Sequence, residues 1–165
     1  MKITETIDYA ATPDAVFAML TDPDFQVAKC LEGGSHRHES AATHTGDGAR
    51  IVTQRDLPGE HLPDFARAIV GETLSVTETY DWAGSKADGT RDGTLVVEVA
   101  GAPVALRAKV RLMPTGSGTT MTIDGDLKAA IPFLGGRVEK AAAPAVVHAI
   151  EGEERTGRRW LAERA

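Results

Sequence analysis

The sequence has few cysteines, few aromatic residues and no long hydrophobic run, and the first and last of these absences exclude whole classes of protein. Cys30 is the single cysteine, so the chain cannot form an internal disulfide, which suits a reducing compartment. It contains no run of about 18 consecutive apolar residues, so we expect no membrane span. Residues 1–6 lack the apolar core of a signal peptide. Together these absences predict a cytoplasmic protein.

Basic residues are also in the minority. The chain carries 18 Lys and Arg against 24 Asp and Glu, a net charge of −6. Because nucleic-acid binding depends on a clustered basic surface, we expect no nucleic-acid partner. The 165 residues are 42% hydrophobic, which predicts a single globular domain over residues 1–165. A chain of this length needs no disulfide or metal to hold its core together.

Aromatic residues make up only 5% of the chain, whereas glycine, with 17 residues, and alanine are abundant. Two explanations are open. The composition reflects a G+C-rich coding bias, or it reflects a core of small side chains that leaves space inside the protein.

The N-terminal part predicts one strand and two short helices. Residues 1–9 alternate between apolar and polar side chains, as in a half-buried strand. Thr12 is a favourable N-cap and Pro13 fits the first helical position, so we expect a helix that ends before Pro23. A second short helix is expected over residues 24–31.

Residues 35–127 alternate with period two, interrupted by glycine-rich turns such as residues 46–48 and 115–118. This pattern predicts six strands in an antiparallel meander. The connector at residues 58–67 is expected to contain a helical turn. We find no internal repeat.

The C-terminal part has helical spacing, and we expect one helix from Pro132 to Ala165. A helix this long must lie on the sheet, so the element order predicts an α+β layered fold. Its sheet-facing stripe is built from small residues in the middle and larger ones toward the ends: Leu134, Val138, Ala142, Ala145, Ala149, Gly152, Thr156 and Trp160.

Two segments resemble the START-like, or helix-grip, superfamily of lipid carriers and polyketide cyclases. Residues 12–23 (TPDAVFAMLTDP) are similar to its first helix, and residues 131–140 (IPFLGGRVEK) to the entrance of its closing helix. Together with Leu62, Pro63 and Trp82 they resemble domain-of-unknown-function family 2505, a bacterial branch. The resemblance implies a curved antiparallel sheet of about six to seven strands, with the long helix in its concave face.

The resemblance and the small-residue stripe together imply a cavity between the sheet and the last helix. We expect it to bind a small hydrophobic molecule such as a lipid, a polyketide or another apolar metabolite, with no cofactor. The protein is expected to be a monomer or a weak homodimer. The residues predicted to line the ligand site are Val76, Glu78, Tyr80, Val138, Ala142, Ala145, His148, Ala149 and Gly152.

Two carboxylates share the parity of apolar strand residues, which is unusual because an unpaired buried carboxylate is costly. Glu5 lies between Ile3 and Ile7, and Glu78 lies between Val76 and Tyr80. Each is either a polar group of the ligand site or a residue turned outward at a strand edge or bulge. His148 has two interpretations as well: an acid or base in the cavity, or an exposed helix residue.

Other polar groups give weaker signals. His36 and His38 form a His-x-His pair, but His44 lies too far along a strand to join them and His61 would need a folded loop, so we predict no metal site. Cys30 lacks the context of a catalytic thiol and is expected to be buried and inert. The following charged residues are expected to form a solvated helix face: Glu151, Glu153, Glu154, Arg155, Arg158, Arg159, Glu163 and Arg164.

Three functional hypotheses follow. The first is a protein that binds or transfers a hydrophobic ligand without covalent chemistry. The second is a cyclase, dehydratase or hydrolase that acts on a polyketide-like or aromatic substrate, with Glu5, Glu78, Tyr80 and His148 as candidate catalytic groups. The third is an interaction domain, which requires an exposed apolar patch of several hundred Å².

Overall fold

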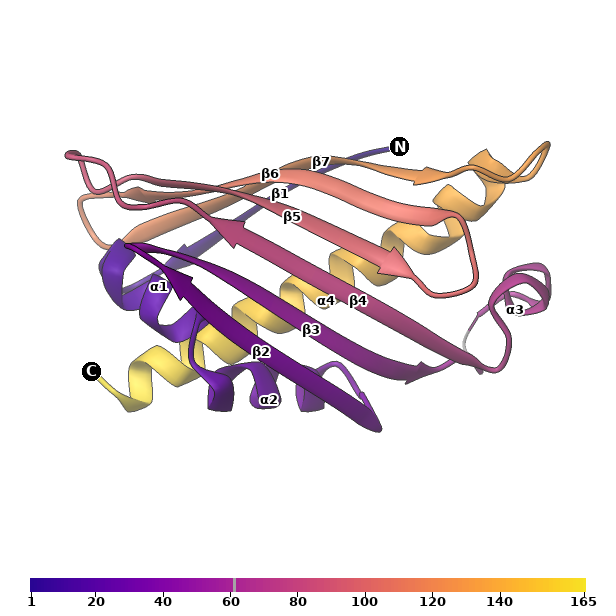
Figure 1. The fold of residues 1–165 in the computed structure, drawn as a ribbon, viewed down its shortest axis with the longest axis horizontal. Coiled ribbons are helices and arrows are strands. Elements are labelled where there is room, and N and C mark those ends of the chain that lie inside the picture. Colours follow the sequence, from indigo (N-terminus) through magenta and orange to yellow (C-terminus); the bar gives the residue numbers. More distant parts are fainter. Residues whose placement is uncertain (61) are drawn as a thin grey trace.

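Seven strands form one antiparallel sheet in the computed structural model, which describes residues 1–60 and 62–165. The spatial order is β1-β7-β6-β5-β4-β3-β2, so the meander pairs neighbours in sequence while β1 closes onto β7 (Figure 1). The α+β helix-grip prediction is therefore confirmed. The strands are β1 (Lys2–Tyr9), β2 (Arg37–Thr45), β3 (Gly48–Pro58), β4 (Thr73–Trp82), β5 (Arg91–Val99), β6 (Val104–Pro114) and β7 (Thr119–Ala129).

The two short N-terminal helices also form as predicted. They are α1 (Pro13–Leu20) and α2 (Pro23–Glu32), and each has a side-chain cap. Thr12 Oγ1 accepts a hydrogen bond from the backbone N–H of Ala15 at 3.3 Å, and Asp22 Oδ1 accepts one from Asp24 at 2.8 Å. These caps satisfy backbone donors that the first turn leaves free. The connector before β4 contains a third helix, α3 (Asp64–Val70).

The long helix α4 (Gly135–Glu163) begins three residues later than predicted. Phe133 adopts a left-handed conformation with φ 63°, so the chain makes a turn at this point and the helix cannot start at Pro132. A Cβ on Gly135 would lie 2.4 Å from the carbonyl oxygen of Ala129. The helix therefore starts where only glycine allows the chain to pass so close to β7.

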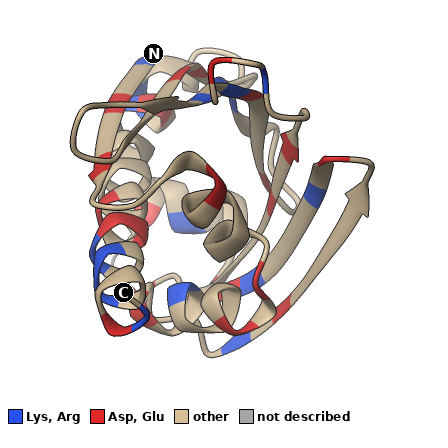
Figure 2. Ribbon diagram, turned by 90° about the vertical axis from the view of Figure 1, so that its left-hand side faces the viewer, with Lys and Arg blue, Asp and Glu red and all other residues tan. Residues whose placement is uncertain are grey.

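Helix α4 lies across the concave face of the sheet, with α1 and α2 beside its C-terminal half (Figures 1 and 2). This end is tightly packed. Phe25 of α2 is fully buried and meets the Trp160 ring edge-on at 5.6 Å between centroids. A Cβ on Gly157 would lie 2.7 Å from the Tyr9 ring, so the helix sits close to β1 here. Figure 2 shows acidic and basic residues interleaved on the exposed side of this end.

None of the helices in the described residues is long and apolar enough to cross a membrane.

Candidate ligand-binding cavity

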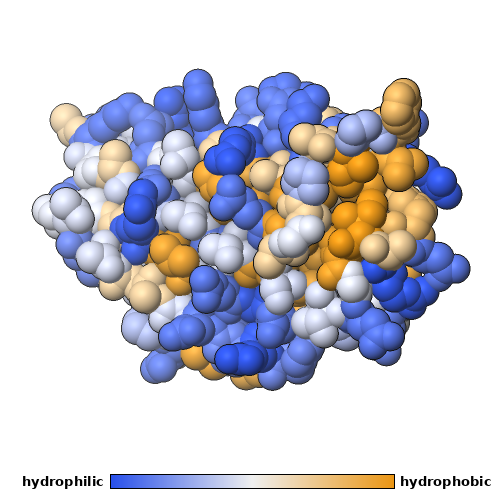
Figure 3. All heavy atoms as spheres, turned by 45° about the vertical axis from the view of Figure 1, so that its right-hand side comes forward, coloured by the Kyte–Doolittle hydropathy of each residue, from blue (hydrophilic) through white to orange (hydrophobic). Residues whose placement is uncertain are grey.

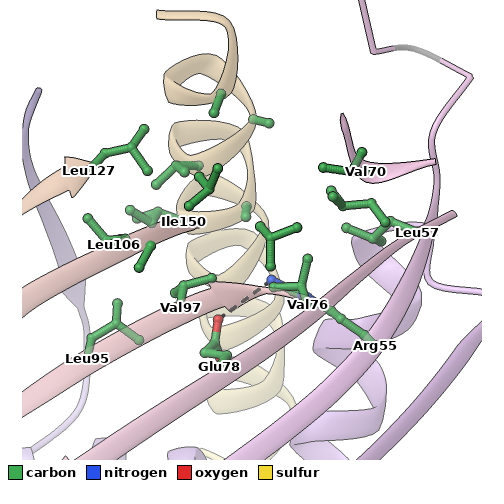
Figure 4. A pocket seen from close by; sticks show the side chains of 18 of the residues that line it. Arg55, Leu57, Val70, Val76, Glu78, Leu95, Val97, Leu106, Leu127 and Ile150 are labelled. Atoms are coloured by element: carbon green, nitrogen blue, oxygen red, sulfur yellow. Dashed lines mark ion pairs between the residues drawn. The ribbon is translucent and has the colours of Figure 1, made fainter. Parts of the chain in front are cut away.

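A cavity of about 160 Å³ lies between the sheet and the N-terminal two thirds of α4, from Val138 to Glu153. Aliphatic side chains from β4, β5 and β6 face the helix across it, and Figure 4 shows Leu95, Val97 and Leu106 on the sheet side and Ile150 on α4. Small helix residues keep the space open, since alanine side chains cannot reach the opposite wall. The helix contributes Val138, Ala141, Ala142, Ala145, Val146, Ala149, Ile150 and Glu153.

The mouth of the cavity lies at the end of the molecule formed by α3 and the first turns of α4. Leu62, Ala66 and Val70 line this end, and the guanidinium of Arg137 stacks on the Phe65 ring at 4.1 Å, which joins α4 to α3. Figure 3 shows that hydrophobic surface gathers at this end of the molecule. Phe133, just before α4, is fully exposed.

Four charged side chains close the inner end of the cavity, and we call Lys29, Arg55, Glu78 and Glu153 the ionic cluster. All four line the cavity, and each side chain is at most 10% exposed. Lys29 Nζ donates to Glu78 Oε1 in a short contact and to Glu153 Oε2 at 3.1 Å. The residues come from α2, β3, β4 and α4, so the cluster joins the short helix α2 and the long helix α4 to the sheet.

Burial and neighbouring charges act in opposite directions on the cluster. Burial alone would raise the pKa of Glu78, but Lys29 and Arg55 hold it below its usual value. Burial is the largest influence on Glu153 and raises its pKa; the Lys29 charge lowers the pKa and the Glu78 charge raises it, and the net shift is upward. Burial alone would lower the pKa of Lys29, yet the two carboxylates keep it above its usual value. Glu78 and Lys29 are therefore charged at neutral pH, and Glu153 is the member that protonates most easily.

The cluster leaves hydrogen-bonding capacity unused at the cavity. Arg55 donates no hydrogen bond to any described residue, its buried Nε has no partner, and Nη2 lies 3.6 Å from Glu78 Oε2. Glu153 Oε1 is likewise buried with no partner. The hydroxyl of Tyr80 donates to Glu153 Oε2 at 3.5 Å, and burial followed by the Glu153 charge holds the pKa of Tyr80 well above its usual value. Buried polar groups are normally satisfied, so these atoms can take a water molecule or a polar group of a ligand as their partner.

Seven of the nine residues predicted for the ligand site line the cavity, although their contact with a ligand stays a prediction. They are Val76, Glu78, Tyr80, Val138, Ala142, Ala145 and Ala149. His148 does not, because its side chain is 74% exposed and lies 3.9 Å from Glu151 on the outer face of α4. Gly152 does not either, since its position faces Glu32 of α2.

The two unusual carboxylates differ in position: Glu78 lines the cavity and Glu5 does not. Glu78 sits in an unbroken ladder, opposite Thr53 on β3 and Val97 on β5, so the edge or bulge interpretation is wrong for it. Glu5 lies on β1, an edge strand, is half-buried, and lies outside the cavity lining.

Sequence reasoning missed Lys29, Arg55 and Glu153. Glu153 does not belong to a solvated face, as predicted, but is 4% exposed, because it follows Ala149 by one helical turn on the sheet-facing stripe. Arg55 shares the parity of the buried residues Ile51 and Thr53. Spacing in α2 likewise places Lys29 one turn after the buried Phe25.

The histidines and Cys30 that the sequence singled out lie outside the cavity lining as far as the structure describes them. Within the described residues, no three His, Cys, Asp or Glu side chains form a group that could hold a metal ion. His61, which we considered as a ligand, lies outside the described residues. His44 is exposed and meets the Phe17 ring edge-on at 6.2 Å. Cys30 is a buried free thiol.

The fold is that of START-like proteins. It matches the STAR-related lipid transfer protein from Xanthomonas axonopodis with TM-score 0.60 and 15% identity, over 98% of this chain and 85% of that one. It also matches the Zhui aromatase/cyclase from Streptomyces sp. R1128 with TM-score 0.57 and 15% identity, over 99% and 93%. At such identities the likeness concerns the fold alone.

Residues 4–161 match the family model described as protein of unknown function (DUF2505), and the chain belongs to this family. The uncharacterized protein Rv0481c of Mycobacterium tuberculosis (strain ATCC 25618 / H37Rv) is 25% identical over 113 residues. That match spans 67% of this chain and 64% of the relative's length.

Proposed function

We propose that this protein binds a small hydrophobic ligand in the cavity between the sheet and α4. The observation that supports this most strongly is the aliphatic wall, which faces unfilled space where most interiors are densely packed. An aliphatic side chain without a packed neighbour lacks the dispersion contacts that a bound apolar ligand would provide. Because domains are stable by only about 5–15 kcal/mol, a ligand that restores these contacts should stabilise the fold measurably.

The size of the cavity limits the ligand. An engineered apolar cavity of about 150 Å³ holds one benzene molecule. A ligand fully enclosed here therefore has about six to eight heavy atoms, and a longer one extends toward the mouth between α3 and α4. The fold shared with a STAR-related lipid transfer protein supports an apolar ligand. The buried thiol of Cys30 suits a reducing cytoplasm, where we place the protein as a monomer or weak homodimer.

Titration with 1-octanol, followed by isothermal calorimetry, tests this function with two matched variants of α4. Ala149→Phe adds a phenyl ring to the cavity wall, and Ala162→Phe adds the same ring at an exposed position of the same helix. We expect 1-octanol to bind wild type and Ala162→Phe equally and Ala149→Phe at least about tenfold more weakly. Absence of binding to wild type, or equal binding to all three proteins, would refute the proposal.

A cyclase, dehydratase or hydrolase activity is the second candidate, because Tyr80 and Glu153 lie 3.5 Å apart at the inner end of an apolar cavity. A carboxyl group with a raised pKa in such a site can act as a general acid or base. Wild type would then convert an aromatic polyketide-like substrate that Glu153→Gln binds without converting. Recovery of the substrate unchanged from both proteins would count against catalysis.

A further inference from the structure

The ionic cluster offers a ligand more hydrogen-bond donors than acceptors. A guanidinium has five N–H donors, and Arg55 uses none of them in a hydrogen bond to a described residue. Lys29 has three donors, two of which reach Glu78 and Glu153. On the acceptor side, Glu153 Oε1 is buried without a partner, and Glu78 Oε2 has only the ion-pair contact with Arg55 Nη2 at 3.6 Å. The ligand group that completes the cluster must therefore mainly accept hydrogen bonds.

The charges of the cluster favour an anion with a single charge. Lys29 and Arg55 carry two positive charges and Glu78 one negative charge, so the balance depends on Glu153. Its Oε2 already accepts from Lys29 and Tyr80, whereas Oε1 is free and is the natural place for a proton. With that proton the cluster has one uncompensated positive charge. A phosphate with two negative charges would exceed this single positive charge, and a neutral hydroxyl would leave the positive charge unpaired.

We propose that the ligand is an apolar molecule with one carboxylate group, which Arg55 holds at the inner end of the cavity; this rests on the hydrophobic-ligand function proposed above. The guanidinium fork matches a carboxylate in a bidentate geometry. The protonated Oε1 of Glu153 donates to the same carboxylate, while the hydrocarbon part lies between Val97, Leu106 and Ile150 (Figure 4). Both orphaned groups of the cluster are then satisfied.

This arrangement couples binding to the protonation of Glu153. The groups that face Glu153 are Lys29 from α2, Arg55 from β3, Glu78 and Tyr80 from β4, and Tyr9 from β1. Arginine stays charged at all relevant pH values. The pKa values of Lys29, Tyr80 and Tyr9 are raised and that of Glu78 is lowered, so near neutrality Lys29 and Glu78 stay charged and both tyrosines stay neutral. Carboxylate affinity therefore falls as the pH rises and Glu153 loses its proton.

A matched pair of probes tests the proposal on the folded protein. Octanoate and 1-octanol have the same number of carbon atoms and differ in the head group, which is a carboxylate in one and a hydroxyl in the other. We expect octanoate to bind wild type at least about tenfold more tightly than 1-octanol near pH 6. The octanoate affinity should then fall as the pH rises through the pKa of Glu153, which lies above its ordinary value of about 4.3, whereas Glu153→Gln, which imitates the protonated side chain, should show no such dependence.

Two arginine variants of β3 assign the preference to the guanidinium. Arg55→Gln should bind both probes with similar affinity, whereas Arg50→Gln, on the exposed face of the same strand, should keep the preference. If octanoate and 1-octanol bind wild type equally, the carboxylate proposal is wrong and the hydrophobic-ligand function stands. If neither binds, that function is wrong. If Arg55→Gln does not fold, the comparison of probes and the pH dependence in wild type still decide the question.

Discussion

Replacing Lys29 by methionine is the most informative perturbation of the cluster. Its side chain is 3% exposed and its ammonium contacts both carboxylates, so the variant leaves Glu78 and Glu153 buried at the same site without their shared counterion. Methionine has a similar length and fills the same space, which limits the loss of packing. Removing one partner of a buried ion pair costs about 3–5 kcal/mol, and we expect the free energy of unfolding at pH 7 to fall by this amount.

The loss of stability caused by Lys29→Met should be smaller at lower pH. In wild type the pKa of Lys29 is raised, so its contribution is complete below about pH 10.4 and is lost only as the pH rises through the folded-state value. The lowered pKa of Glu78 gives a contribution that is present above about pH 4.3 and lost below it. Without Lys29, burial and mutual repulsion raise the pKa of both carboxyls, and proton uptake then stabilises the fold. The penalty should therefore shrink as the pH falls from about 7 to about 5.

Urea unfolding followed by circular dichroism at both pH values measures this penalty. Lys86→Met is the control, because Lys86 is 54% exposed and its ion pair with Asp92 should contribute only about 0–1 kcal/mol. The double variant Lys29→Met/Glu153→Gln removes one of the stranded charges and should be more stable than the single variant by about 1–2 kcal/mol. A penalty for Lys29→Met below about 1 kcal/mol, or one that is equal at both pH values, would show that the cluster is not a buried network held by Lys29.

Three further results are expected. Phe25→Ala should lower the free energy of unfolding by about 3–5 kcal/mol in urea, because it empties a fully buried site against Trp160, and a loss below about 1 kcal/mol would contradict that packing. Pro144→Ala should raise the free energy of unfolding by about 1–3 kcal/mol, because an exposed proline inside α4 cannot donate the helical N–H hydrogen bond. A variant less stable than wild type would contradict this expectation. Burial raises the pKa of Cys30, so a thiol reagent should modify native protein far more slowly than unfolded protein, and equal rates would argue against a buried thiol.

The layered fold was predictable because its signals are local and redundant. Alternation along Val104–Leu112 set the buried face of β6, and the Thr12 cap with Pro13 marked the start of α1. The start of α4 was not predictable, because it depends on the left-handed conformation of Phe133 and on the approach of Gly135 to Ala129, both of which are tertiary features.

The cavity wall was predictable and its ionic end only in part. Helical spacing identified the alanines of α4, and strand parity identified Glu78. Lys29 was missed because a lysine in a short helix is normally solvated, yet here it is 4% exposed while Leu31 of the same helix is 59% exposed. Its burial depends on two carboxylates that lie 49 and 124 residues further along the chain. Only the folded structure brings these charges together.

Methyl chemical-shift mapping by NMR during titration with 1-octanol tests the central claim most directly. We predict that the shifts concentrate on the methyl groups of Val76, Val97, Leu106 and Ile150, which surround the cavity. The exposed side chain of Leu31 on α2 should not respond. Shifts confined to Leu31 and its surroundings would indicate a surface interaction patch in place of a ligand cavity. No shifts at any methyl group would show that the cavity does not bind an apolar molecule.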